Sequence, residues 1–513
     1  MTTRNSRITK VPFVKGWLPP YWPYFVVTAV FAAFRFFYRI GLDVKFDHTP
    51  VFFFIQYINP WFVEHDFVRS LLYLHQQAPL QNLLTGACMR IFGNAVAFTI
   101  LDVLYTALGL TTVLCILHAM LRLGAARLLA AVSVSLYAAS PVTVLYETWL
   151  FYHMPVAALL LLSLVALLRY FRTGTFGAGL CFFCLFAGVS LFYSMFSPLL
   201  LVAVTLVLLL RPPSPERAGV SPRARMLWAF SIPFCLLVLN QAKTKLLVGH
   251  EPGTAYLWEN LAVKTYDEMR PAERQILVDR GRITRAPGLV LFAVPLSSYA
   301  ELRIPHKPTG IPLLDLETTP DGNPNPHAIE KVLIAEKYYK HDALYLLRHH
   351  FDYYWRAVIE GLTVGYFTSP MDYDDTIQTD NRKILSSVAK KTDRWLFPDS
   401  QGRLLMLVVA LPITLLYGLY RVLGPRTLLE SERSTVAAFS YMLLIIAYVT
   451  FATTLISVGD FSRYRFNIDP FYLIIFVLML TDCAKHATVL WRRVCVWYRS
   501  RYEQHAEPIC GNQ

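Results

Sequence analysis

Long apolar runs constrain the fold of this chain more than any other feature. A helix that crosses a bilayer needs about 20 apolar residues, because each residue adds about 1.5 Å along an axis that must span roughly 30 Å. Only 16% of the 513 residues are charged and 55% are hydrophobic, whereas soluble domains carry about 25% charge. The candidate spans are 20–41, 95–120, 127–144, 149–168, 176–194, 196–211, 226–246, 403–421, 436–457 and 468–487. We predict an all-α polytopic membrane protein with about ten transmembrane helices.

The basic residues predict the orientation of these spans. The segments on one side of the membrane, beginning with the N-terminus, are rich in Lys and Arg. The opposite loops, apart from one long segment, carry Lys45, Arg69, Arg463 and Arg465. Because loops rich in Lys and Arg stay in the cytoplasm, both termini are expected there, which requires an even number of spans. The net charge of +13 follows from this bias, and we do not expect nucleic-acid binding.

The spans divide the chain into four regions. Residues 1–246 form an N-terminal transmembrane bundle with a first outer loop at 42–78, and an amphipathic helix at 79–93 leads into the second span. Residues 247–402 have ordinary polarity, turn signals at 320–325 and a helical apolar face near 327–360. They are expected to form a mixed soluble domain on the non-cytoplasmic side, between spans seven and eight. Residues 403–490 supply the last helices, and 491–513 form a basic cytoplasmic tail.

Two details of this division stay open. The runs 176–194 and 196–211 are short and could be one interrupted helix pair, which bears on the number of crossings. The eight cysteines give no disulfide framework, because none lies in 247–402. Cys181 and Cys184 form a CxxC inside an apolar run, where buried small side chains are the better interpretation.

Acidic residues follow the first span. Asp43 and Asp47 open the first outer loop, and Glu64 and Asp66 come later in it. A carboxylate at the water–lipid edge can accept a proton from an attacking hydroxyl. The alternative is a solvated loop with ordinary acids.

Charged residues near three further spans are also candidates. Glu147 lies in a short outer turn at membrane depth, where a charge is either functional or paired with an arginine. Arg463 and Arg465 lie on the side that is poor in basic residues; they suit a lipid phosphate, or they pair with Asp460 or Asp469. Asp102 lies inside the second span, and we expect a hydrogen-bonded structural role for it. No phosphate loop, zinc motif or nucleophile elbow occurs, so no metal ligands are predicted.

Four segments resemble the GT-C superfamily of membrane glycosyltransferases, which includes the protein O-mannosyltransferases and the lipid A aminoarabinose transferase. They are the acids after the first span, the stretch 77–84 (QAPLQNLL) followed by Phe92-Gly93, the Ser140-Pro141 turn with Tyr146, and Arg463-Tyr464-Arg465-Phe466 followed by Pro470. The resemblance is diffuse, covers roughly 20–170 and 400–490, and leaves 247–402 unmatched.

This resemblance implies a function. Such enzymes take a sugar from a polyprenyl-phosphate donor on the non-cytoplasmic face and pass it to a lipid, glycan or protein acceptor. Asp47 or Asp43 would be the base, Glu147 would position a substrate, and Arg463 and Arg465 would hold the lipid phosphate. His48 follows Asp47 where many members carry a second acid, so the choice among Asp43, Asp47 and Asp66 stays open, as does a divalent cation.

Other functions are compatible with the sequence. A transporter or flippase of lipid-linked sugars would need polar residues along several spans, and Asp102 is the main example. A non-catalytic envelope assembly protein would use 247–402 to bind a partner. A polymerase or ligase acting on lipid-linked glycans is a close enzymatic neighbour. We expect a multi-pass protein of the bacterial inner membrane with its active face outward, and the endoplasmic reticulum is the alternative.

Overall fold

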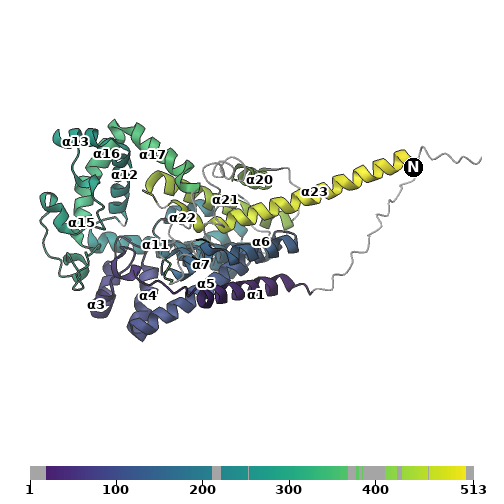
Figure 1. Cartoon of the computed structure of the whole chain (residues 1–513), viewed down its shortest axis with the longest axis horizontal. Helices are drawn as coiled ribbons and strands as arrows, with labels where there is room; N and C mark the ends of the chain where they lie inside the picture. The colour runs from purple at the N-terminus through teal and green to yellow at the C-terminus, as the bar shows by residue number, and fades with distance from the viewer. Residues whose placement is uncertain are drawn as a thin grey trace, which may run out of the picture.

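The protein is built from helices joined by turns. The computed structural model describes residues 19–210, 221–251, 253–367, 377–379, 411–424, 430–459 and 461–503, and the single residues 384 and 387. Within these residues there are isolated β-bridges but no strand. The long helices gather into a bundle, and shorter helices cover one end of it (Figure 1). The predicted all-α architecture is confirmed for the described residues, whereas 1–18, 211–220 and most of 380–410 lie outside them.

Six helices are long and apolar enough to cross a membrane. They are α1 (Trp22–Phe36) with its continuation η1 (Phe37–Gly41), α5 (Asn94–Arg122), α8 (His153–Thr173), α11 (Pro222–Val248), α21 (Glu430–Ile456) and α23 (Asp469–Glu503). A seventh candidate is the bent pair α6 (Arg127–Ala139) and α7 (Pro141–Thr148). Shorter helices occupy the other predicted runs: α9 (Phe176–Phe192), α10 (Pro198–Leu209) and α20 (Leu411–Leu423). The chain is thus a multi-pass membrane protein, and ten crossings stay a prediction.

Local sequence explains where these helices break. Pro141 begins α7, because its missing N–H costs nothing at a helix start, and the Ser140 hydroxyl accepts the Val142 N–H at 3.3 Å. The two helices meet there at 53°. Between α4 (Pro79–Phe92) and α5, Gly93 has φ of +74°, a conformation that favours glycine. The predicted lead-in helix is therefore a separate element.

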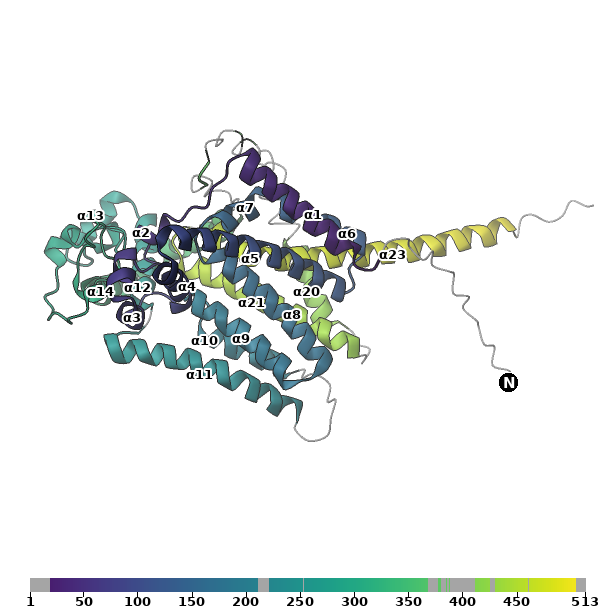
Figure 2. The same ribbon diagram turned by 90° about the horizontal axis from the view of Figure 1, so that it is seen from below.

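Helix α8 lies at the centre of the bundle. In its apolar stretch 78% of the residues are buried, compared with 22% in α1 and in α11. It packs against α5, α9 and α21 (Figure 2). Gly179 of α9 allows a close approach, because a Cβ there would lie 3.0 Å from the Tyr170 ring of α8. The outer faces of α1 and α11 are left to contact lipid.

Short helices cover one end of the bundle. They come from the first loop, from 250–367 and from the segment before α23. They are α2 (Pro50–Phe53), α3 (Pro60–Tyr73), α12 (Thr254–Glu268), α13 (Pro271–Asp279), η2 (Ala286–Gly288), η3 (Leu296–Leu302), α14 (Pro312–Asp315), α15 (Ile329–Ile334), η4 (Ala335–Tyr339), α16 (Lys340–His349), α17 (Phe351–Thr363), η5 (Gly365–Phe367) and α22 (Phe461–Phe466). They lie opposite the end where α1 begins and α23 finishes (Figures 1 and 2).

The described part of 247–402 differs from the predicted mixed domain. It is helical without a strand, and many of its buried residues, such as Ala255 and Leu291, belong to the same hydrophobic core as the bundle, whereas Met269, Leu277, Ile283 and Leu346 form a small separate cluster. The Lys264 ammonium donates to the Ser457 carbonyl at 2.8 Å, at the end of α21. Burial against the bundle lets short helices persist that would not be stable alone. This segment is therefore an outer layer on the bundle.

Candidate functional site

A cavity of about 750 Å³ lies where the bundle meets the outer helices. This volume is within the range of about 300–1,000 Å³ that is usual for small-molecule sites. Its lining comes from 53–56, 75–78, 151–152, 190–198, 237–241, 253–263, 290–293, 448–458 and 463–464. These segments are distant in sequence, yet they belong to, or adjoin, the loops that the charge pattern predicts to be non-cytoplasmic.

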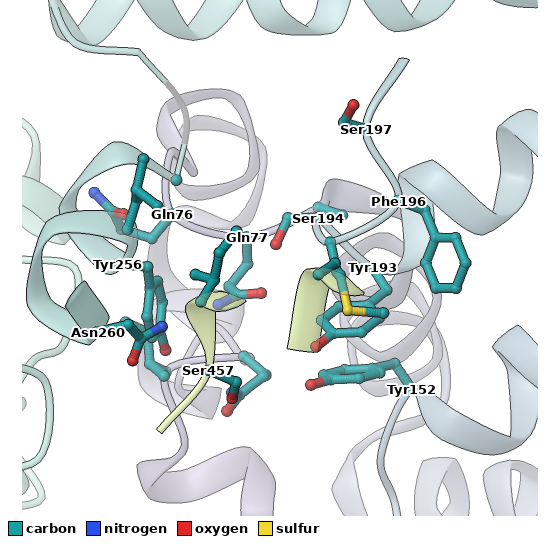
Figure 3. A pocket seen from close by; sticks show the side chains of 18 of the residues that line it. Gln76, Gln77, Tyr152, Tyr193, Ser194, Phe196, Ser197, Tyr256, Asn260 and Ser457 are labelled. Atoms are coloured by element: carbon teal, nitrogen blue, oxygen red, sulfur yellow. The ribbon is translucent and has the colours of Figure 1, made fainter. Parts of the chain in front are cut away.

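Neutral hydrogen-bonding groups and aromatic rings dominate the lining. Six amide side chains contribute: Gln56, Gln76, Gln77, Asn240, Gln241 and Asn260. Serine and tyrosine hydroxyls come from several helices, and Figure 3 shows Tyr256 and Asn260 on one side with Tyr152 and Tyr193 on the other. Amides and hydroxyls both donate and accept, and ring faces pack against C–H surfaces. This combination suits a polyhydroxylated ligand.

Arg463 is the arginine of this lining. It begins the Arg-Tyr-Arg stretch of α22, and its side chain is buried. The guanidinium carbon lies 5.2 Å from the Phe151 ring centroid and 5.3 Å from that of Tyr464, a cation–π arrangement. One Nη also donates to the Tyr464 hydroxyl at 3.4 Å. The aromatic rings fix the position of a buried cation at the cavity wall.

Glu259 of α12 is the carboxyl group of the lining. Its Oε1 accepts the Leu291 N–H at 2.7 Å, and among the described residues no donor reaches Oε2. Burial raises the pKa of Glu259 to about 8, and the Leu291 hydrogen bond and Lys331 oppose this shift. Burial likewise lowers the pKa of Lys331, which donates to the Val294 carbonyl, to about 8. A carboxyl with a pKa near neutrality can take or give a proton.

The first-loop acid Asp47 does not line the cavity. It is buried, and its Oδ1 accepts the backbone N–H and the hydroxyl of Thr49 at 2.9 and 2.7 Å. Its backbone N–H donates to the Thr148 carbonyl at 2.7 Å, and its carbonyl accepts the Leu150 N–H at 2.8 Å. These contacts tie the first loop to the segment after α7.

Asp43 and Asp66 also lie outside the lining. Asp43 has φ of +49° and forms an ion pair with Lys45 at 3.1 Å, with nearly half of its side chain exposed. Asp66 lies at a kink inside α3, where its φ and ψ are −149° and 46°, and its carboxylate is 3.8 Å from Arg69. The structure therefore does not bring the three first-loop candidates together with Arg463.

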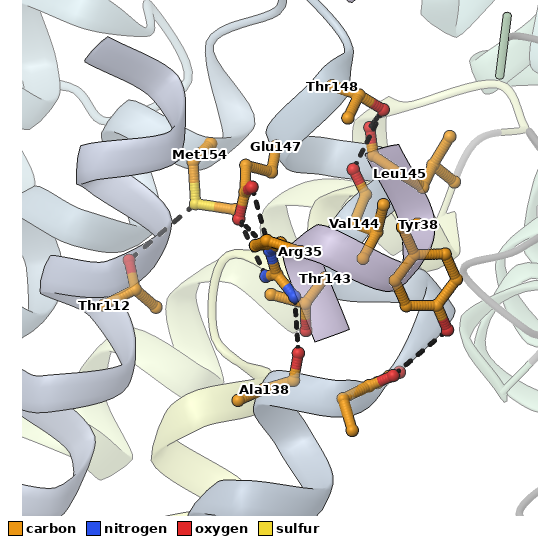
Figure 4. Close-up of polar contacts among 12 residues, drawn as sticks. Arg35, Tyr38, Thr112, Ala138, Thr143, Val144, Leu145, Glu147, Thr148 and Met154 are labelled. Carbon is orange, nitrogen blue, oxygen red and sulfur yellow. Dashed lines mark hydrogen bonds and ion pairs between the residues drawn. The ribbon is translucent and has the colours of Figure 1, made fainter. Parts of the chain in front are cut away.

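Glu147 is paired within the bundle (Figure 4). Its carboxylate is fully buried and accepts the Arg35 Nε–H at 2.9 Å, and an Arg35 Nη lies 2.7 Å away. Arg35 also donates to the Ala138 carbonyl at 2.6 Å. Gly109 leaves the space, because a Cβ there would lie 2.2 Å from Glu147 Oε2. Glu147 does not line the cavity. Its contacts are those expected if it pairs with an arginine, the alternative to a functional role.

Two other predicted residues are also paired away from the cavity. Arg465 donates to Asp469 Oδ1 at 3.0 Å and to the Tyr366 carbonyl. Its ion pair with Asp469 is the alternative to phosphate binding that the sequence left open. Asp102 pairs with Arg39 of η1, in agreement with the structural role expected for it. Of the predicted site residues, Arg463 alone lies in the cavity lining.

No protein-family model, curated protein or solved structure matches this chain. The resemblance to GT-C glycosyltransferases thus stays a prediction. Among the residues that the structure describes, no group of three His, Cys, Asp or Glu side chains could hold a metal ion.

Glu259 and the amides of the lining were not among the site residues predicted from the sequence. Glu259 is followed at once by Asn260 in a polar stretch, which is typical of an exposed helix. A signal was present, because Ala255, Glu259 and Ala262 recur at helical spacing on one face and all three are buried. An acid on an apolar face is worth treating as a candidate.

Proposed function

We propose that this protein is a membrane glycosyltransferase that takes a sugar from a polyprenyl-phosphate donor and transfers it to a lipid, glycan or protein acceptor. The observation that carries the proposal is Arg463, a buried cation in the wall of a cavity otherwise lined mainly by neutral and aromatic groups. An arginine fork suits a phosphate monoanion or diester. The lining also includes Leu237 of α11 and Ala452 of α21, apolar positions in spanning helices where a lipid tail could approach.

The reaction is a displacement at the anomeric carbon. The acceptor oxygen forms a bond to C1, the bond from C1 to the phosphate oxygen breaks, and its electron pair leaves with polyprenyl phosphate. Arg463 stabilises the charge that grows on this leaving group. The acceptor proton passes to a carboxylate, and Glu259 lies in the cavity whereas Asp43, Asp47 and Asp66 do not. Attack opposite the phosphate inverts the configuration at C1.

The membrane arrangement belongs to the same proposal. We propose ten crossings with both termini in the cytoplasm, which puts the cavity on the non-cytoplasmic face of a bacterial inner membrane. Helix α1 begins and α23 finishes at the same end of the bundle, away from the short helices that cover the other end (Figure 2). This is the relation expected of an even number of crossings.

The test compares Arg463→Gln with Arg356→Gln, which removes an exposed arginine of α17. The purified protein in nanodiscs is titrated with undecaprenyl phosphate, and transfer from undecaprenyl-phosphate sugars is followed by the covalent product. Losing a charged hydrogen bond of about 1.5–3 kcal/mol predicts affinity roughly 10- to 150-fold lower for Arg463→Gln alone. Equal affinity of both variants would overturn the role of Arg463. Movement of the lipid-linked sugar without a product would favour the flippase.

A further inference from the structure

Two buried acceptor atoms at the cavity edge have no donor among the described residues. Gln76 and His75 are each 2% exposed, both line the cavity, and neither Gln76 Oε1 nor His75 Nε2 has a hydrogen-bond partner there. His75 Nδ1 lies 3.1 Å from the Tyr73 carbonyl and must donate to it, which leaves Nε2 as the acceptor. Burial chiefly, with His327 second, lowers the pKa of His75 to about 3, so the ring is neutral. Buried polar atoms of this kind need a partner, and here a ligand can supply it.

Stacked aromatic rings form part of the cavity wall. The rings of Tyr152 and Tyr193 stack with centroids 4.0 Å apart and planes 22° apart, and Tyr464 stacks on Tyr193 at 6.1 Å. Figure 3 shows Tyr152 and Tyr193 across the cavity from Tyr256 and Asn260, with Gln77 between them. A flat ring system opposite amides matches a sugar, which has C–H faces and a rim of hydroxyls.

The few charged groups in the cavity lining would give an ionised sugar little stabilisation. Arg463 is assigned to the phosphate by the proposed function. Glu259 is chiefly protonated at neutral pH, because burial raises its pKa to about 8. A hydroxyl can donate to Gln76 and to His75, or accept from the amide if Gln76 is rotated, whereas a carboxylate cannot donate. An ammonium group could also donate to both acceptors, but it would share the cavity with the Arg463 guanidinium, a charge of the same sign.

We infer that Gln76, His75 and Asn260, facing the stacked Tyr152 and Tyr193, form the subsite for the transferred sugar, and that this sugar is uncharged and recognised through its hydroxyls. This rests on the proposed function and deepens it, since it names the class of donor. It also separates this protein from an aminoarabinose transferase, whose sugar carries an amine.

The experiment uses wild type, Gln76→Ala, Asn260→Ala and the control Gln275→Ala, an exposed amide of α13 that lies outside the cavity. The probes are bare undecaprenyl phosphate and undecaprenyl phosphate carrying glucose, mannose, galactose, glucuronic acid or 4-amino-4-deoxyarabinose. Wild type is expected to bind at least one neutral donor about tenfold more tightly than the bare lipid and than either charged donor. Gln76→Ala and Asn260→Ala should remove most of this gain while leaving binding of the bare lipid, and Gln275→Ala should change neither.

Each outcome bears on one of the two proposals. Preference for a charged donor, or a sugar-dependent gain that survives in both variants, overturns the subsite while the glycosyltransferase stands. Failure of wild type to bind undecaprenyl phosphate in any form overturns both. If Gln76→Ala does not fold, as judged by its elution and thermal midpoint, Asn260→Ala and the isosteric Gln76→Glu decide, and Gln76→Glu should select against glucuronic acid further.

Discussion

Replacing Glu147 with glutamine leaves the Arg35 guanidinium buried between α1, α6 and α7 without an anion. In the native structure the single Arg35 Nε–H is shared between the two carboxylate oxygens, each 2.9 Å away, and the guanidinium carbon lies 4.1 Å from the centroid of the Phe31 ring. Removing one partner of a buried ion pair costs about 3–5 kcal/mol, because the remaining charge keeps its desolvation penalty. Glutamine retains one carbonyl acceptor, so we expect about 3 kcal/mol for Glu147→Gln.

The same reasoning predicts recovery when both charges are removed. The double variant Arg35→Met/Glu147→Met replaces the pair with apolar side chains of similar length, an exchange that is often neutral or stabilising. Thermal midpoints of wild type, both single variants and the double variant in one detergent complete a double-mutant cycle. Each single variant should be destabilised, and the double variant should be close to wild type.

Activity separates a structural role of Glu147 from a catalytic one. Transfer per folded molecule should be near wild type in the double variant, since Glu147 does not line the cavity. A Glu147→Gln protein with an unchanged midpoint and no transfer would refute this reasoning, and would restore Glu147 as a residue that acts on substrate.

Three further perturbations test the packing and the titrating groups. Gly109→Ala puts a Cβ 2.2 Å from Glu147 Oε2 and should destabilise by about 1–3 kcal/mol, whereas Gly177→Ala, with nothing within 4 Å of the new Cβ, should be neutral or stabilising by up to about 1 kcal/mol in the same melting assay. If Glu259 takes the acceptor proton, transfer should rise about tenfold between pH 7 and 9 as its carboxyl ionises, and Glu259→Gln should flatten that profile. Burial lowers the pKa of Lys264 to about 8, so the unfolded chain binds more protons between about pH 8 and 10.5 and stability should rise through that window by up to about 3 kcal/mol. Lys264→Met should remove this rise, and an identical pH slope in both proteins would contradict it.

The helices could be predicted because the bilayer imposes a length and a polarity that are visible in sequence. An apolar run such as 153–173 has few alternatives to a spanning helix. Breaks at Pro141 and Gly93 follow from local backbone chemistry. The character of 247–402 was less readable, because short helices that share a core with the bundle have no length signal of their own.

Two of the ion pairs could not be predicted, because they join residues 112 and 63 positions apart. Arg35 meets Glu147, and Arg39 meets Asp102, only after α1 packs beside α5 and α6. Before folding is known, Glu147 at membrane depth is equally compatible with catalysis and with pairing. Arg463 was accessible to sequence reasoning, since an arginine on the side that is poor in basic residues requires a specific cause.

The outer segment is part of the site. Glu259 and Asn260 lie in the cavity wall on α12, and Phe292, between η2 and η3, lines the same cavity. Lys264 and Tyr354 hold this layer to the end of α21 through the Ser457 and Leu455 carbonyls, at 2.8 and 3.0 Å. The apolar cluster that this layer has to itself, Met269, Leu277, Ile283 and Leu346, is small, whereas a detachable partner-binding domain would have a full core of its own and would leave the cavity intact when removed. Here its removal would take away one wall and the carboxyl group, so we expect that 254–367 expressed alone would not fold and that the remaining bundle would not transfer.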